Sequence, residues 1–177
     1  MGFQSELNTP DWTLFVFPLL AMLAWNVLVG IWVQIWGKKD NSWMDVNYGI
    51  TFLIPNTYIL IARRDEITPR MILVTAIIYF WGLRLAYHIW ARHKQEDYRY
   101  KQMREDWQAK GTCYYYFAAF TFVYLMQGVF SAIVNCSALF INLYSVKQPG
   151  DPVFWVTDYL GLAVWITGFL IEYISDY

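Results

Sequence analysis

Charged residues are scarce in this chain. They make up 15% of its 177 residues, against roughly a quarter in an ordinary globular protein. The formal net charge is −1, so the chain lacks the basic surface that binding to DNA or RNA requires. We therefore expect no nucleic-acid partner.

Cysteine and histidine are also rare. The sequence holds two cysteines, Cys113 and Cys136, and two histidines, His88 and His93. Their spacing fits neither a metal site nor a disulfide framework. We therefore expect no metal, and we interpret both cysteines as buried thiols. The sequence also shows no glycine-rich phosphate loop, no Ser-His-Asp set and no internal repeat.

The N-terminal stretch lacks the marks of a cleaved targeting peptide. Residues Met1 to Trp12 include Glu6 and Asp11 but neither lysine nor arginine. A secretory signal needs a positive start, and a mitochondrial presequence needs arginine and few acids. We expect the first apolar helix to act as the targeting signal instead.

Hydrophobic residues make up 58% of the chain, and aromatic residues make up 20%. A helix needs about 20 apolar residues to cross ~30 Å of hydrocarbon. Five stretches approach this length, at 13–36, 46–62, 71–90, 114–144 and 153–174, and a charged loop covers 91–113. We predict an all-α integral membrane protein, a single domain over 1–177 built as a bundle of about five transmembrane helices. A soluble bundle is rejected because five nearly uncharged stretches leave too little polar surface.

Three of these segments have particular features. Pro55 and Asn56 interrupt the short second stretch, so we expect a kinked or partly buried helix there. The fourth stretch is too long for one straight crossing and should tilt or project beyond the bilayer. Residues 92–100 are expected to continue the third helix, and the segment 148–152 is a strong turn signal.

Lysine and arginine are unevenly divided between the two ends of the expected bundle. With the N-terminus on side one, that side collects Arg63, Arg64, Arg70 and Lys147, and side two collects Lys38, Lys39, Arg92, Lys94, Arg99, Lys101, Arg104 and Lys110. Positive loops stay on the cytoplasmic side of a membrane. Side two and the C-terminus are therefore predicted to face the cytosol or the mitochondrial matrix.

Polar side chains within apolar stretches are costly and are candidates for function. Arg84 lies in the third stretch, and His88 follows one turn later on the same face. Arg84 either extends to the positive side of the membrane or, with His88, holds an anionic group or a carboxylate of a neighbouring helix. We favour a structural ion pair.

Two further sets of polar residues lie at helical spacing. Gln127, Ser131 and Asn135 form a stripe that either lines a lipid or ligand cavity or hydrogen-bonds between helices, the commoner use. Glu172 and Asp176 form a carboxylate pair near the end of the fifth stretch. They are either an interfacial polar end or part of a ligand site.

Five short motifs occur in the order and spacing of a known membrane family. They are Asn41-Ser42-Trp43-Met44-Asp45, Trp81-Gly82-Leu83-Arg84-Leu85, Glu96-Asp97-Tyr98-Arg99-Tyr100, Leu125-Met126-Gln127-Gly128-Val129 and Gly168-Phe169-Leu170-Ile171-Glu172 with Ser175-Asp176. Over residues 38–177 the chain resembles the steroid 5-alpha-reductase-like membrane family, and within it the uncharacterised "steroid dehydrogenase" branch. Tyr48 departs from the family, which usually has tryptophan there.

The resemblance implies a helical membrane fold with a ligand cavity between helices. In active relatives NADPH delivers a hydride to an enone, and much of the cofactor site belongs to a C-terminal half that this sequence does not contain. The resemblance leaves counterparts of cofactor-binding residues only at Arg84, Arg99, Tyr100, Glu172 and Asp176. These five cannot enclose a dinucleotide alone. We therefore expect no catalytic residue and no cofactor in the chain as it stands, and NADPH only if a C-terminal half exists.

Two functions follow from this interpretation. The first, which we favour, is a non-catalytic, enzyme-derived accessory subunit that holds lipid and packs against other membrane subunits of a larger complex, possibly one of the respiratory chain. The second is the N-terminal part of an NADPH-dependent reductase of a steroid or lipid enone. The first favours the mitochondrial inner membrane, and the second favours the endoplasmic reticulum.

Overall fold

The computed structural model describes residues 12–145 and 153–176. Regular structure in these residues is entirely helical, which confirms the predicted all-α class. The long elements are α1 (Trp12–Ile35), α4 (Pro69–Arg92), α7 (Met126–Tyr144) and α8 (Val156–Ser175); the shorter ones are α2 (Trp43–Thr51), α3 (Leu53–Ala62), η1 (Arg64–Glu66), α5 (Tyr98–Ala109), α6 (Thr112–Ala118) and the π-helix η2 (Ala119–Leu125). The expectations for residues 1–11 and for the turn at 148–152 lie outside the described residues.

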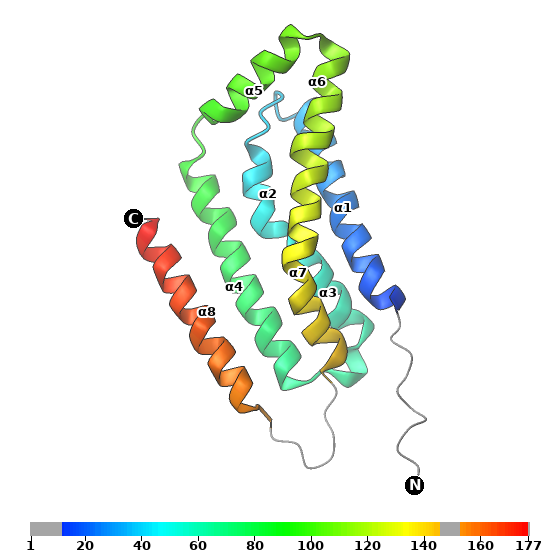
Figure 1. Ribbon diagram of the computed structural model, residues 1–177, viewed down its shortest axis with the longest axis vertical. Helices are drawn as coiled ribbons and strands as arrows, with labels where there is room; N and C mark the ends of the chain where they lie inside the picture. Colours follow the sequence, from blue (N-terminus) through cyan, green and yellow to red (C-terminus); the bar gives the residue numbers. More distant parts are fainter. Residues whose placement is uncertain (1–11, 146–152, 177) are drawn as a thin grey trace.

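The helices form a bundle whose rods alternate in direction (Figure 1). Helices α1, α4 and α8 run one way, while the α2–α3 pair and the continuous rod α6–η2–α7 run the other. The polar helix α5 lies across one end, and α8 occupies the edge of the bundle beside α4.

Three helices of the described part are long and apolar enough to cross a membrane, which indicates a membrane protein. They cover Trp12–Ile35, Pro69–Arg92 and the 33 residues of Thr112–Tyr144. The predicted count of about five is not confirmed by length and composition. The second stretch is divided into helices of 9 and 10 residues, and α8 carries Asp158 and Glu172 near its ends.

The break between α2 and α3 falls where Pro55 predicts it. Proline has no N–H to donate to the carbonyl four residues earlier, which here belongs to Thr51. The helix is interrupted at Phe52, whose carbonyl accepts a hydrogen bond of 2.9 Å from the side-chain amide of Asn56. The side chain of Asn56 therefore supplies a hydrogen bond to a backbone carbonyl at the break.

Helices α2 and α4 touch through their backbones at Gly49 and Gly82. A Cβ added to Gly82 would lie 2.5 Å from the carbonyl oxygen of Gly49, and one added to Gly49 would overlap the carbonyl of Gly82. Only glycine permits so close an approach, which is a common way for helices to associate in lipid.

Buried asparagines connect the helices through the interior. The amide of Asn47 donates to the Oδ1 of Asn26 at 3.0 Å, which links α2 to α1. Asn56 donates to Asn135 at 3.0 Å and accepts from Asn142 at 2.9 Å, which links α3 to α7. All five residues are at most 5% exposed. Such interhelical hydrogen bonds stabilise a membrane bundle by about 0.6 kcal/mol each.

The π-helix η2 adjusts the register of the long rod. Tyr115 and Tyr124 are nine residues apart, about two and a half turns of an α-helix, which would place them on opposite faces. The wider π turn brings both phenols to α1, where Tyr115 donates to the Oε1 of Gln34 at 2.9 Å and Tyr124 also contacts Gln34. Gly30 of α1 leaves room for the ring of Tyr124.

Two expectations for the charged loop are wrong. The third helix does not continue through residue 100, because it ends at Arg92 and a new helix, α5, starts after Asp97. The carboxylate of Asp97 accepts the backbone N–H of Arg99 at 2.9 Å and so caps α5. Cys113 is exposed rather than buried, since it lies in the first turn of α6, and Cys136 is half-buried.

Candidate functional site

A cavity of about 930 Å³ opens between α2, α4, α5 and the η2–α7 rod. Its apolar lining comes from α4, α5 and the η2–α7 rod and includes Leu85, Ile89, Met103, Phe122, Met126 and Phe130. Polar and charged side chains also line it, and Asp45, Asp97, Arg99 and Tyr100 form a cluster that we call the polar end. A cavity of this kind suits an amphipathic ligand.

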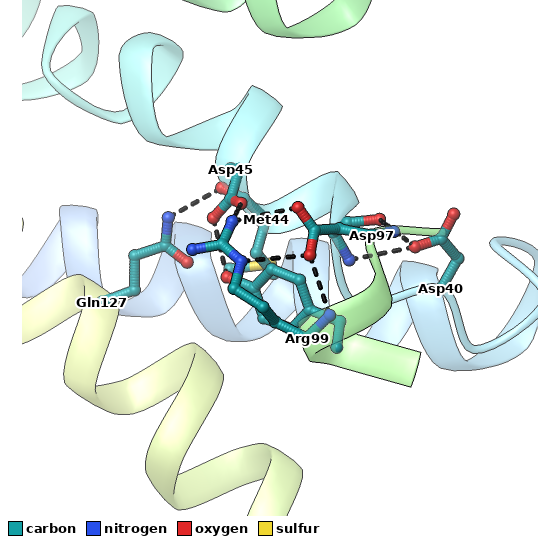
Figure 2. A network of polar contacts seen from close by, with 8 residues as sticks. Asp40, Met44, Asp45, Asp97, Arg99 and Gln127 are labelled. Atoms are coloured by element: carbon teal, nitrogen blue, oxygen red, sulfur yellow. Dashed lines mark hydrogen bonds and ion pairs between the residues drawn. The ribbon is translucent and has the colours of Figure 1, made fainter. Parts of the chain in front are cut away.

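The polar end is positioned by the turn that precedes α2. The Oδ1 of Asp40 accepts the backbone N–H of Ser42 at 3.0 Å. The hydroxyl of Ser42 in turn accepts the backbone N–H of Asp97 at 3.3 Å. These bonds fix the start of α5 against the start of α2, although the two lie 55 residues apart in the chain (Figure 2).

Asp45 is the centre of the polar end. Its Oδ1 accepts the phenol hydrogen of Tyr100 at 2.7 Å, and its Oδ2 lies 3.8 Å from Arg99. Arg99 also pairs with Asp97 at 3.0 Å. Figure 2 shows Asp45, Arg99 and Asp97 as one network, with Gln127 donating to the backbone carbonyl of Met44 beside it at 2.8 Å.

The two carboxyls of this network are shifted in opposite directions. Burial raises the pKa of Asp45, although the hydrogen bond from Tyr100 and the charge of Arg99 oppose the shift. The hydrogen bond from Arg99 lowers the pKa of Asp97. Burial and the neighbouring Asp45 raise the pKa of Tyr100, so its phenol stays a hydrogen-bond donor at every physiological pH.

Substitution of each carboxyl by asparagine should change the free energy of unfolding in opposite directions. The pKa of Asp45 is higher in the folded than in the unfolded protein. The free energy of unfolding therefore falls as the pH rises and Asp45 ionises. Asp45→Asn keeps the acceptor for Tyr100 and should raise the free energy of unfolding at pH 7 by up to about 1 kcal/mol.

The matched variant Asp97→Asn should lower the free energy of unfolding. The pKa of Asp97 is lower in the folded protein, so its carboxylate stabilises the fold at any pH above that pKa. We expect a loss of up to about 1 kcal/mol at pH 7. The Asp45 difference should shrink toward zero as the pH falls to about 4, whereas most of the Asp97 difference should persist at that pH, because the folded pKa of Asp97 lies below the ordinary value of an aspartate. Thermal unfolding in detergent between about pH 4 and pH 8 checks this, and equal signs for the two variants would contradict it.

A second charged cluster joins α4 to α8. Arg84 pairs with Glu172 and, at 2.7 Å, with Asp176. Its guanidinium also lies 5.2 Å from the ring centroid of Phe169. The indole N–H of Trp81 donates to Glu172 at 2.9 Å. Arg84 therefore holds carboxylates of a neighbouring helix.

The other sequence-predicted residues are divided between two places. His88 lines the cavity with Asp176, from which its Nε2 lies 3.8 Å away. Gln127 also lines it. Asn135 belongs to the asparagine core and borders a different cavity, between α4, α7 and α8. Ser131 is fully buried, and its hydroxyl has no hydrogen-bond partner within the described part of the chain.

Comparison with protein families decides the kinship of the chain. The family described as "Protein of unknown function (DUF1295)" matches residues 31–177. The chain belongs to the DUF1295 family. Neither the comparison with curated proteins nor the comparison with solved structures gave a match.

Five residues of this DUF1295 chain resemble cofactor-binding residues of the reductase-like family. As the structure pairs them, they do not form a dinucleotide site. Arg84 is paired with Glu172 and Asp176, and Arg99 is paired with Asp97. Two guanidinium nitrogens of Arg84 and two of Arg99 are bound to these carboxylates, which leaves neither arginine the two-nitrogen edge that binds a phosphate in bidentate fashion. As they are paired in this structure, these five residues do not fit the cofactor, and no reaction step is derived through it.

Two pairs of functional interest were missed in the sequence. Asp45 and Asp97 lie in motifs that were recognised, yet nothing in the sequence shows that they flank the same arginine. Arg70 and Asp158 form an ion pair of 2.7 Å between α4 and α8, and each looked like an ordinary end of a helix. No group of three His, Cys, Asp or Glu side chains that could hold a metal occurs in the described residues.

Proposed function

We propose that this DUF1295 protein is a non-catalytic membrane subunit that holds a lipid in the cavity between α2, α4, α5 and α7. The observation that carries the proposal is a lining that combines apolar side chains with the polar cluster of Asp45, Asp97, Arg99 and Tyr100. A lipid with a polar group suits such a lining, with its hydrocarbon along Phe122, Met126 and Phe130 and its polar group near Tyr100.

The pairing of the charged groups supports a holding role rather than a catalytic one. Asp45 is paired with Tyr100, Asp97 with Arg99, and Asp176 with Arg84. Such pairs stabilise a fixed arrangement, whereas a catalytic acid or base has to reach the substrate. The resemblance to steroid 5-alpha-reductase-like proteins supports a flat or chain-like lipid as the ligand.

Five membrane crossings are part of this proposal. Helix α8 pairs with α4 at Arg70–Asp158 and again at Arg84–Glu172, so it lies at the same depth as a candidate span. The α2–α3 pair packs between α1, α4 and α7. We place the α5 end on the cytosolic or matrix side, following the lysines and arginines. Labelling of single cysteines from each side of a sealed membrane tests this orientation.

Partner subunits are proposed from the outer surface. Large apolar side chains are exposed along α1, including Phe17, Leu20, Leu28 and Ile31. Lipid tails or partner helices can cover such a surface. We favour the mitochondrial inner membrane over the endoplasmic reticulum, and imaging of a tagged full-length protein with markers for both membranes tests that choice.

A tryptophan inside the cavity tests the lipid directly. Leu85 lines the cavity, whereas Leu83 on the same helix is 52% exposed and points away. We expect Leu85→Trp to reduce the lipid that co-purifies with the protein at least about fivefold, a cost of about 1 kcal/mol in binding. Mass spectrometry of lipids extracted after size exclusion measures this.

Leu83→Trp is the matched control, since it introduces the same side chain two residues away. Its lipid content should equal that of the wild type, and the thermal unfolding of both variants shows whether they fold. Equal lipid in folded Leu85→Trp and Leu83→Trp would overturn the cavity as the lipid site.

A second candidate function is supported by one contact. Tyr100 lines the cavity and donates its phenol hydrogen to Asp45. In this candidate function the carbonyl of a steroid or lipid enone replaces Asp45 as the acceptor of that hydrogen. This would suit the N-terminal part of a reductase for which NADPH supplies the hydride. Saturable, NADPH-dependent reduction of an enone, lost in Tyr100→Phe, would favour this function over the first.

A further inference from the structure

Helix α8 is fastened to α4 near both of its ends. One ion pair joins Arg70 to Asp158, and the other joins Arg84 to Glu172. On each helix the second residue lies fourteen positions after the first, which is about 21 Å along the axis. None of the described residues of α8 is buried. Between the two ion pairs α8 therefore lies loosely against the bundle, with Phe169 in contact with Phe80 of α4.

A groove of about 980 Å³ separates this part of α8 from α4 and α7. Its walls are apolar along most of their length, with Val74, Ile77 and Ile78 from α4, Ala138 and Ile141 from α7 and Leu162 from α8. The groove is distinct from the cavity described above, which lies between α2, α4, α5 and α7.

Two glycines of α8 widen the groove. Gly161 and Gly168 line it, and a Cβ added to either would meet no atom within 4 Å. Gly49 and Gly82 behave in the opposite way, because a Cβ at either position would enter the facing backbone. The glycines of α8 therefore do not serve close packing between the described helices.

The length of the groove between the two ion pairs suits hydrocarbon chains. The length is sufficient for the chains of one leaflet, whose depth is about half of the ~30 Å hydrocarbon core.

The end of the groove at Arg70 suits a polar head group that carries both charges. Arg70 and Asp158 present opposite charges there, with 28% and 17% of their side chains exposed. Tyr144 and Trp155 border the same end, and both are more than 40% exposed. Tyrosine and tryptophan are typical of the membrane–water interface, and their rings also attract quaternary ammonium groups.

We propose that this groove binds a zwitterionic diacyl phospholipid. Its phosphate would contact the guanidinium of Arg70 beside the one nitrogen that is bound to Asp158, its ammonium group would lie near Asp158 and the two aromatic rings, and its chains would extend between α4, α7 and α8. The proposal does not depend on the cavity beside Asp45 or on the function assigned to it.

The test uses phosphatidylcholine with a photoreactive acyl chain, added to the full-length protein in lipid nanodiscs. Peptides that carry the crosslinked lipid are identified by mass spectrometry. We expect crosslinks on the groove faces of α4, α7 and α8. Unlabelled phosphatidylcholine should compete about tenfold better than phosphatidylglycerol, whose head group lacks the ammonium.

Gly168→Phe and Ala163→Phe form the matched pair of variants. Gly168 faces the groove, and Ala163 lies on the opposite side of the same helix, since five residues rotate by about 140° beyond one full turn. Labelling of the groove peptides should fall at least about fivefold in Gly168→Phe and stay unchanged in Ala163→Phe. The groove signal should persist in Leu85→Trp, which alters only the cavity.

Three results would overturn the proposal. One is equal labelling in Gly168→Phe and Ala163→Phe, provided that both show wild-type thermal unfolding. Another is equal competition by phosphatidylglycerol. The third is a crosslink from a photoreactive residue at position 161 to another polypeptide rather than to lipid, which would show that a protein segment covers the groove.

Discussion

Gly82→Ala should separate α2 from α4 and lower the free energy of unfolding by about 3 kcal/mol. The new methyl group would lie 2.5 Å from the carbonyl oxygen of Gly49. The obstacle is backbone, which cannot move aside by rotating a side chain, so the two helices themselves must shift. Chemical or thermal unfolding of the purified protein in detergent measures the loss.

The same substitution at Gly168 is its control. A Cβ at Gly168 meets nothing within 4 Å, and alanine favours a helix over glycine by up to about 1 kcal/mol. Gly168→Ala should therefore leave the stability unchanged or raise it slightly. Comparable losses in the two variants would show that the contact between Gly49 and Gly82 is not special.

Arg84→Leu should release α8 from the bundle. The side chain of Arg84 is 14% exposed and neutralises both Glu172 and Asp176. Its loss leaves two carboxylates without their cation beside apolar surface, at a cost of about 3 kcal/mol. Hydrogen exchange followed by mass spectrometry should show faster exchange over residues 156–175 than in the wild type, with α1 unchanged.

Two further variants sharpen this result. Arg92→Leu removes a more exposed arginine from the end of α4 and should cost under about 1 kcal/mol. Arg84→Lys should recover only part of the stability, because an ammonium group cannot bridge two carboxylates as a guanidinium does. Unchanged exchange of α8 in Arg84→Leu would mean that Arg84 merely extends to the membrane surface.

The sequence predicted well those segments whose structure depends on nearby residues, through apolar length or proline. Long apolar stretches indicated α1, α4 and α7, and Pro55 indicated the break after α2. The start of α5 was available from Asp97, a good N-cap residue, but the mixed charges after Arg92 resembled the exposed end of a longer helix. Local propensity does not decide between these alternatives.

Features that depend on residues distant in the chain could not be predicted. The π-helix has no composition of its own, and the contacts that accompany it join Tyr115 and Tyr124 to Gln34, which lies 81 and 90 residues earlier in the chain. The contact of Gly49 with Gly82 depends on the packing of two separate helices. The sequence shows that Asp45, Asp97 and Arg99 are charged. Their common network depends on the hydrogen bond from the backbone of Asp97 to Ser42, which places the start of α5 beside α2.

Native mass spectrometry of the full-length protein, released from its membrane in mild detergent and mixed with NADPH, tests the central claim most directly. We predict a particle heavier than the 21.0 kDa chain, which carries partner subunits and bound lipid and takes up no NADPH. A free particle with the mass of the chain that binds NADPH and retains no lipid would contradict the account.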